Sequence, residues 1–170
     1  MSGLHMLRPF SARQLHLVAG DGRVEAFAVV GDHGTGPSVN VHVPTLRRRM
    51  RDLAPHISTV VFFDEPVPDG ALVALIDDMV EEFVDSAHDV LAVGMAVTEA
   101  VKWVEDDRVL HDVDRAGLVT VQCPEVVDRR RLDEALEKLG DRMWINPANL
   151  IVSDGGSLRI YDVASRRPVG

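Results

Sequence analysis

The alternation of apolar and polar positions divides the chain into strand-like and helix-like segments. Residues 24–30 (VEAFAVV), 57–63 (ISTVVFF) and 90–97 (VLAVGMAV) are short apolar runs bounded by turn or charged residues, which is typical of strands. After the second run, Asp69 is the expected cap of a helix whose apolar positions recur at steps of three and four residues. These positions are Leu72, Val73, Ile76, Met79, Val80 and Phe83. The order strand, helix, strand predicts a right-handed parallel crossover.

Two further helices are predicted. Pro44 and Thr45 begin a short one, and Asp128 caps an amphipathic one that runs through Leu139 and ends at Gly140. Their arginines form two basic clusters, Arg47, Arg48, Arg49 and Arg51 in the first and Arg129, Arg130 and Arg131 in the second. Such runs usually lie on solvated helix faces, so we expect no catalytic role for them.

The pattern changes again between residues 98 and 122. Here short strand-like pieces surround the charged turn 105–107, which predicts a protruding β-arm, and SLRIYDV at residues 157–163 is the expected last strand. Nothing in the composition marks a linker or a repeat. We therefore predict a single α/β domain over residues 1–170, a mostly parallel twisted sheet flanked by helices, with the arm at about 98–122.

Composition narrows the possible ligands and location. A net charge of -9 repels polyanions, so we expect no nucleic acid as a partner. The apolar runs are far shorter than the roughly 20 residues of a membrane span, and the first 20 residues lack a secretory apolar region. The only cysteine, Cys123, cannot form an internal disulfide. These features favour a cytoplasmic protein that does not bind membranes.

Two segments have chemical as well as structural interpretations. Asp64 follows a predicted central strand, where ligands gather in open parallel sheets, although a cap of a helix or turn is an equal alternative. The glycine-containing sequence GDHGTGPS at residues 31–38 matches no phosphate-binding pattern. We interpret it as a loop.

Five short motifs follow one another between residues 60 and 161: VVFFDEPVP, AVTEAVK, VDRAGL, QCPE and LRIY. In order and spacing they are similar to V-x-H-D-A-A-R-P, P-V-x-D-T-x-K, V-D-R-x-G-L, Q-T-P-Q and I-K-V-T of the 2-C-methyl-D-erythritol 4-phosphate cytidylyltransferase family. The likeness is clear over somewhat less than half of the chain. It implies a nucleotidyltransferase-like fold.

The resemblance also implies site residues. Asp64 stands at the family aspartate and would bind a metal or a hydroxyl, and Arg115 stands at the arginine that contacts methylerythritol phosphate. Lys102 and Arg159 match two family lysines. These four are the candidate catalytic residues of an enzyme that makes 4-diphosphocytidyl-2-C-methyl-D-erythritol from CTP for isoprenoid synthesis. An active enzyme would need Mg²⁺; an inactive one would need no cofactor.

The chain also departs from the family pattern. Val67, Ala100 and Cys123 replace polar family contacts, and the glycine-rich loop that holds CTP has no equivalent except VAGDGRVEA, which runs into a predicted strand. Because the arm is retained and pairs subunits in the family, the second hypothesis is a noncatalytic, dimer-forming relative, either a homodimer or paired with a full-length family member. A third is an unrelated α/β domain.

The retained residues have structural alternatives too. Arg115 would pair with Asp112 or Asp114 in the arm, and Lys102 would be solvated. Cys123 is expected to be a small core residue, and His111 to lie on an arm face. CTP or a small phosphorylated molecule remains the expected ligand.

Overall fold

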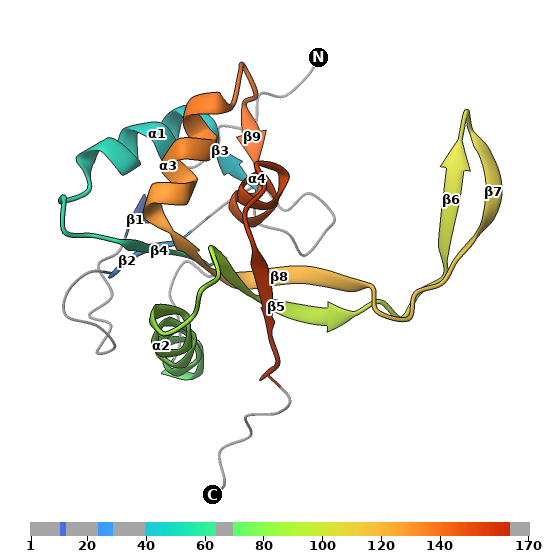
Figure 1. The fold of residues 1–170 in the computed structure, drawn as a ribbon, viewed down its shortest axis with the longest axis horizontal. Helices are drawn as coiled ribbons and strands as arrows, with labels where there is room; N and C mark the ends of the chain where they lie inside the picture. Colours follow the sequence, from blue (N-terminus) through green and yellow to red (C-terminus); the bar gives the residue numbers. More distant parts are fainter. Residues whose placement is uncertain (1–10, 13–23, 29–39, 64–69, 164–170) are drawn as a thin grey trace, which may run out of the picture.

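The computed structural model describes residues 11–12, 24–28, 40–63 and 70–163. Six strands within these ranges form one sheet in the order β1-β2-β4-β8-β5-β10 (Figure 1). Their bounds are β1 (Ser11–Ala12), β2 (Val24–Ala28), β4 (Thr59–Phe63), β8 (Val119–Asp128), β5 (Val90–Ala96) and β10 (Leu158–Tyr161). The strands predicted over 24–30, 57–63, 90–97 and 157–163 are thus confirmed with shifted ends.

The prediction of a mostly parallel sheet is wrong at its centre. β2 pairs with β4 and β5 pairs with β10 in parallel, but β8 lies between β4 and β5 and is antiparallel to both. β1 is antiparallel to β2. The predicted crossover does leave β4 and β5 running in the same direction. The chain then leaves the sheet for the arm and returns as β8, which fills the space between them.

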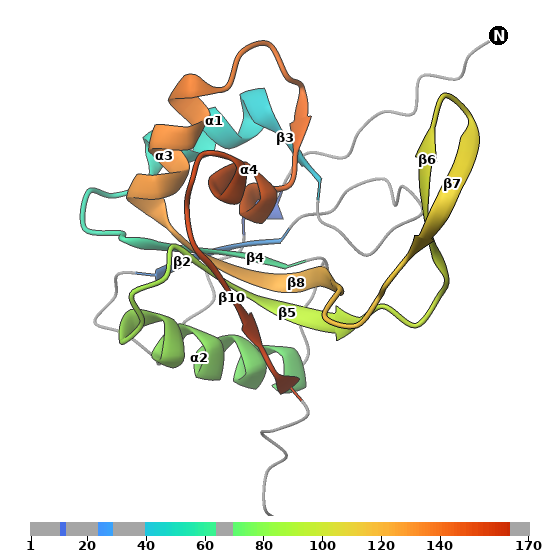
Figure 2. The same cartoon turned by 45° about the vertical axis from the view of Figure 1, so that its right-hand side comes forward.

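Helices cover both faces of this mixed sheet (Figure 2). α2 (Gly70–Val84) lies on one face, and α1 (Val43–Asp52), α3 (Arg129–Lys138) and α4 (Pro147–Ser153) lie on the other. Alternation along β4 serves both layers: Val61 and Phe63 pack with α2, and Val60 and Phe62 pack with the other three helices. Flanking helices were predicted for an α/β domain, and this part of the prediction is confirmed.

The arm is a separate two-stranded sheet that projects from the body (Figure 1). It consists of β6 (Val101–Glu105) and β7 (Arg108–Val113), joined by Asp106 and Asp107, both at positive φ. Positive φ at both central turn residues matches the right-handed twist of a tight hairpin, and aspartate tolerates it better than most residues. The predicted arm and its charged turn are confirmed.

Five elements were not predicted from the sequence: β1, β3, β8, β9 and α4. β3 (Val41–His42) pairs antiparallel with β9 (Trp144–Ile145), and α4 follows β9 directly. The backbone N–H of Val43 at the start of α1 donates to the Met143 carbonyl oxygen at 2.9 Å, which ties α1 to the same unit. Among the described residues, no helix has the length and apolar content needed to cross a membrane.

Candidate functional site

Asp64 lies outside the described residues, as do Val67 and Pro68. The structure does place the strand before it: β4 ends at Phe63 beside β2, which ends at Ala28, and the two run parallel. The next residues in sequence after these adjacent ends are Asp64 and the segment that contains GDHGTGPS. Open α/β sheets bind ligands beyond the carboxyl ends of such strands.

Arg159 lies on β10, the edge strand of the described sheet. Its guanidinium forms an ion pair with Glu82 of α2, with 3.1 Å between Nη2 and Oε1. About half of the Arg159 side chain is exposed, whereas the Glu82 side chain is largely buried. Arg159 therefore links the edge strand to the helix layer.

Lys102 and Arg115 both belong to the arm and its root. The Lys102 ammonium pairs with the Asp112 carboxylate across β6 and β7. Arg115, in the connection from β7 to β8, donates a hydrogen bond to the Thr98 carbonyl oxygen at the start of the arm. Asp112, one of the two partners expected for Arg115, thus pairs with Lys102, and Arg115 donates to a backbone carbonyl oxygen.

The structure therefore does not gather the described candidate residues into one site. Lys102, Arg115 and Arg159 each contact a different partner, one within the arm, one at its root and one on the sheet edge. Within the described part of the chain, no three His, Cys, Asp or Glu side chains are grouped so as to hold a metal ion.

The remaining alternatives from the sequence can be located as well. Cys123 is partly buried and packs against the core, as expected for a small core residue. His111 is exposed on the arm, and its ring lies parallel to that of Trp103, with 6.3 Å between centroids. The arm-face expectation for His111 is confirmed.

The two arginine clusters contain a contact that the sequence did not indicate. Arg47 of α1 donates hydrogen bonds of 2.7 Å to the carbonyl oxygens of Leu136 and Leu139 at the end of α3. Arg129, the first residue of α3, donates to four carbonyl oxygens at and after the end of α1. These belong to Ala54 (2.6 Å), Ile57 (3.0 Å), Met50 (3.3 Å) and Leu53 (3.5 Å).

Each helix thus supplies an arginine that caps the other. The last carbonyls of a helix have no partner within it and carry the negative end of its dipole, which is why a guanidinium is stabilising there. The expectation of a solvated helix face is therefore wrong for Arg129, whose side chain is 17% exposed, whereas Arg47 is exposed and also bonds the end of α3. Other members of the clusters form ion pairs, Arg130 and Arg131 with Glu134, and these hydrogen bonds lower the pKa of that carboxyl.

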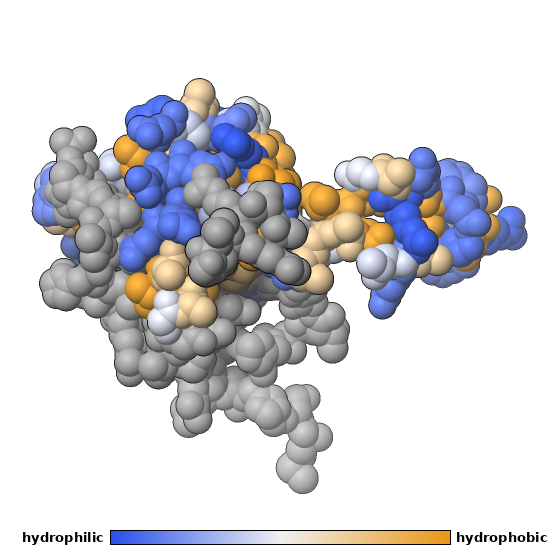
Figure 3. Space-filling model, turned by 90° about the horizontal axis from the view of Figure 1, so that it is seen from below, coloured by the Kyte–Doolittle hydropathy of each residue, from blue (hydrophilic) through white to orange (hydrophobic). Residues whose placement is uncertain are grey.

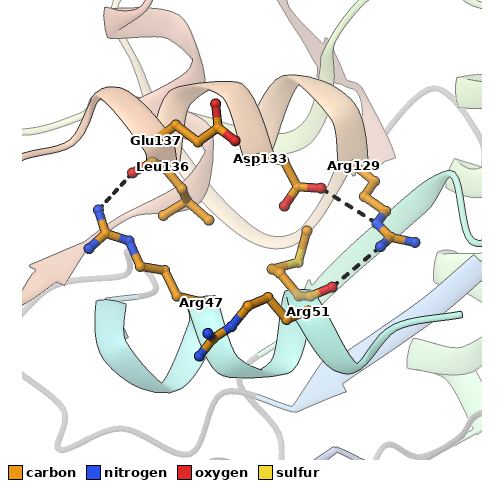
Figure 4. A pocket seen from close by; sticks show the side chains of 7 residues that line it. Arg47, Arg51, Arg129, Asp133, Leu136 and Glu137 are labelled. Carbon is orange, nitrogen blue, oxygen red and sulfur yellow. Dashed lines mark hydrogen bonds and ion pairs between the residues drawn. The ribbon is translucent and has the colours of Figure 1, made fainter. Parts of the chain in front are cut away.

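A surface groove of about 720 Å³ lies between these two helices (Figure 4). Its lining consists of Arg47, Met50, Arg51, Arg129, Asp133, Leu136 and Glu137. The guanidinium groups of Arg47 and Arg129 are already used as caps, and Arg129 Nε also lies 3.6 Å from the Asp133 carboxylate. The groove is therefore mainly a seam between α1 and α3.

Glu125 is the most unusual ionisable residue of the described part. It is fully buried in β8, at the centre of the sheet, where Asn146 Nδ2 donates to Oε1 at 2.7 Å and the Ala148 N–H donates to Oε2 at 3.3 Å. Burial raises the pKa of this carboxyl from its usual 4.5 to about 7, although both hydrogen bonds oppose the shift.

Sequence reasoning matched Glu125 to a family glutamine and gave it no role. A signal was present, because Glu125 is followed by two valines and shares the face of Val127 by strand alternation. Recognising it required knowing that residues 119–128 form a central strand. Pro124 directly before it argues against that assignment.

Comparisons with known proteins bear on the fold. Comparisons with models of protein families and with curated protein sequences found no match. Solved structures do match. The 4-diphosphocytidyl-2C-methyl-D-erythritol synthase of Anaerococcus prevotii aligns with a TM-score of 0.58 at 13% identity, over 76% of this chain and 61% of that one.

Two structures titled 2-C-methyl-D-erythritol 4-phosphate cytidylyltransferase also match. The Francisella tularensis protein has a TM-score of 0.52 at 15% identity, over 75% of this chain and 62% of that one. The Thermus thermophilus protein has a TM-score of 0.50 at 14% identity, over 86% and 75%. This chain spans less than two thirds of the Anaerococcus and Francisella proteins. At this identity the likeness concerns the fold: the chain has, in part, the α/β fold of the 2-C-methyl-D-erythritol 4-phosphate cytidylyltransferases.

Proposed function

We propose that this chain is a noncatalytic, dimer-forming relative of the methylerythritol phosphate cytidylyltransferases, whose working surface is the arm. The observation that carries the proposal is the apolar surface of the arm. Trp103, Val104, Val109 and Leu110 are each more than half exposed. A two-stranded sheet without further packing is marginally stable in water, so such a hairpin needs a partner to cover it.

The apolar surface continues along the root of the arm. Met95, Leu118 and Val119 are exposed where β5 and β8 leave the body, and Figure 3 shows apolar side chains along this neck and on the arm. Large contiguous apolar patches on a protein surface mark interaction sites. A second copy of the arm is the simplest partner, because a twofold contact needs only one self-complementary surface. The alternative partner is the arm of a full-length family member.

The basic residues support the noncatalytic part of the proposal. A phosphoryl-transfer site needs several cationic groups converging on one triphosphate. Here Lys102 and Arg159 are paired with Asp112 and Glu82, and Arg115 bonds a carbonyl oxygen. Ligand binding would have to break these contacts and bring the three side chains together from separate parts of the molecule.

Sedimentation equilibrium on the purified chain tests the proposal. We expect a dimer for the wild type and a monomer for Trp103→Glu and Leu110→Glu, since each places a charge in the buried interface. Val84→Glu is the matched control, because Val84 is an equally exposed valine on α2, away from the arm. A wild-type monomer that also fails to associate with a full-length cytidylyltransferase would contradict the proposal.

Residual cytidylyltransferase activity is the second candidate, and the position of β2 favours it. Because β2 and β4 are adjacent and parallel, the glycine-containing segment 31–38 follows one strand end and Asp64 follows the next. In this function Asp64 would bind Mg²⁺, which neutralises triphosphate charge, and Arg115 would hold the acceptor phosphate.

Pyrophosphate release from CTP, methylerythritol phosphate and Mg²⁺ separates the two candidates. The noncatalytic proposal expects no release above background. Pyrophosphate release that is abolished by Asp64→Asn and by Arg115→Ala, but not by the control Asp107→Asn at the arm tip, would contradict the noncatalytic proposal and support an active cytidylyltransferase.

A further inference from the structure

Among the described residues, the part of the core around Glu125 contains no compensating charge. Its β-sheet neighbours are Phe62 on β4 and Ala92 on β5, and neither of these strands contains a titratable residue. β9 and α4, which cover it, contain none either. From α1 and α3, the residues in this core are apolar: Val43, Leu46, Met50, Leu132 and Leu136. β3 contributes Val41 to the core, and its other residue, the titratable His42, lies beside Trp144 of β9. On β8 itself, the other titratable group in this core is the Cys123 thiol.

Both hydrogen bonds to Glu125 come from the start of α4. Asn146 donates through its side chain, and its Oδ1 in turn accepts from the Asn149 N–H at 2.7 Å, which caps the helix. Ala148 donates through its backbone N–H. The carboxyl is therefore the polar link by which the β9–α4 segment is fixed to the centre of the sheet. No cation from the described part of the chain contacts this link, so charging it places a carboxylate without a described counter-charge in an apolar core.

We propose that Glu125 is a proton-dependent latch: with its carboxyl neutral the β9–α4 segment is held on the sheet, and ionisation of the carboxyl weakens that attachment. This inference is independent of the proposed function of the arm. β9 and α4 should respond before β4 or β5, because they cover Glu125 from outside the sheet. Opening them hydrates the carboxylate, and this gain opposes the loss of the two hydrogen bonds that favour its charged form.

The direction of the pH dependence follows from burial. The pKa of Glu125 is raised from 4.5 to about 7 in the folded chain, so folding favours the protonated form. The contribution of the protonated carboxyl to the free energy of unfolding is complete below pH 4.5. It decreases as the pH rises above 4.5 and is lost above pH 7. A shift of this size corresponds to about a 300-fold increase in the unfolding equilibrium constant from a pH well below 4.5 to a pH well above 7.

Hydrogen exchange and urea unfolding from pH 5 to 9 test the latch on the full chain. We expect amide protection in residues 144–153 to fall between about pH 5 and 7 and to level off above pH 7, after correction for intrinsic exchange rates, while protection in β5 changes less. Glu125→Gln should abolish most of this dependence and be more stable than the wild type at pH 8. Glu137→Gln, the same change at an exposed carboxyl of α3, should behave as the wild type.

Asn146→Asp provides a second test that keeps the helix cap. Aspartate still accepts from the Asn149 N–H, but it removes the donor to Glu125 and adds a carboxyl beside it, so the loss of protection should begin at a lower pH and be deeper at pH 8. An unchanged pH profile in Glu125→Gln would overturn the latch, as would equal loss of protection in β5 and residues 144–153. Should Glu125→Gln not fold, the wild-type and Asn146→Asp exchange profiles decide alone.

Discussion

β4 of the body and β6 of the arm are both five-residue strands, but they differ in what covers them. Every residue of β4 is buried between two helix layers, whereas in β6 Val101 alone is partly covered. Strands in the body are stabilised mainly by the apolar side chains that they bury on both faces. The arm has only cross-strand pairs, such as Trp103 with His111, which contribute little each. Substitutions in the body should therefore change the free energy of unfolding, whereas substitutions on the arm should change the association of the chain with its partner.

The largest expected effect is in the centre of the body. Phe62→Ala should lower the free energy of unfolding by about 3–5 kcal/mol, because Phe62 is fully buried and its removal leaves a cavity. Leu110→Ala on the arm should change the stability of the monomer by less than about 0.5 kcal/mol. Urea unfolding at low protein concentration measures both. Equal losses would show that the arm is part of the cooperative body.

The seam between α1 and α3 is the next test. Arg129→Ala should cost about 2–3 kcal/mol, since four carbonyl oxygens lose a charged donor. Arg130→Ala is the neighbouring control: its ion pair with Glu134 is exposed, so the cost should be under about 1 kcal/mol. Thermal unfolding and urea unfolding should both show the larger loss of stability for Arg129→Ala. A cost for Arg129→Ala no larger than that of its neighbour would mean that the caps contribute little.

A smaller effect is expected where β5 leaves the body. Gly94→Ala should cost about 1–3 kcal/mol, because an added Cβ would lie 2.5 Å from Cγ2 of Ile160 on β10. Gly140→Ala is the control, because nothing lies within 4 Å of its added methyl group. Both variants reduce the conformational entropy of the unfolded chain in the same way. The difference in unfolding free energy between the two variants isolates the clash. Indistinguishable variants would show that β10 moves away easily.

The smallest effect is expected on the arm itself. Lys102→Ala removes an ion pair with Asp112 whose two side chains are 47% and 76% exposed, so it should cost about 0.2–1 kcal/mol at most. Raising the salt concentration should reduce the difference from the wild type further. A cost well above 1 kcal/mol would indicate that the pair becomes buried in an assembled dimer, which a repeat at higher protein concentration would reveal.

The same contrast explains which elements were predictable. β4, β5, α2 and α3 have local periodic patterns, because each buries a face against a neighbour, and the charged turn marks the arm. β8 was missed because its outer half carries polar residues of the arm root and its centre contains Pro124. β3, β9 and α4 are too short to show a period.

Pairing and sites depend on residues that are distant in sequence. Nothing near Val119 indicates that the strand returns between β4 and β5, and that return makes the sheet mixed. Arg47 and Arg129 resemble surface arginines until the ends of the opposite helices are placed beside them. The family motifs predicted the fold but not the contacts of Lys102, Arg115 and Arg159. Their partners are Asp112, the Thr98 carbonyl oxygen and Glu82. Asp112 and Glu82 lie outside the motifs, and Thr98 stands at a position that the family pattern leaves open.

The connection between β5 and β8 has a consequence for engineering and descent. Ala96 pairs with Val119, and the Val97 N–H donates to the Leu118 carbonyl oxygen, so β5 and β8 are the two legs of one long hairpin and the arm is an insertion at its tip. A short turn in place of the inserted residues would keep every strand pair of the body. The strand pairs of the body thus place no constraint on the length of the inserted arm.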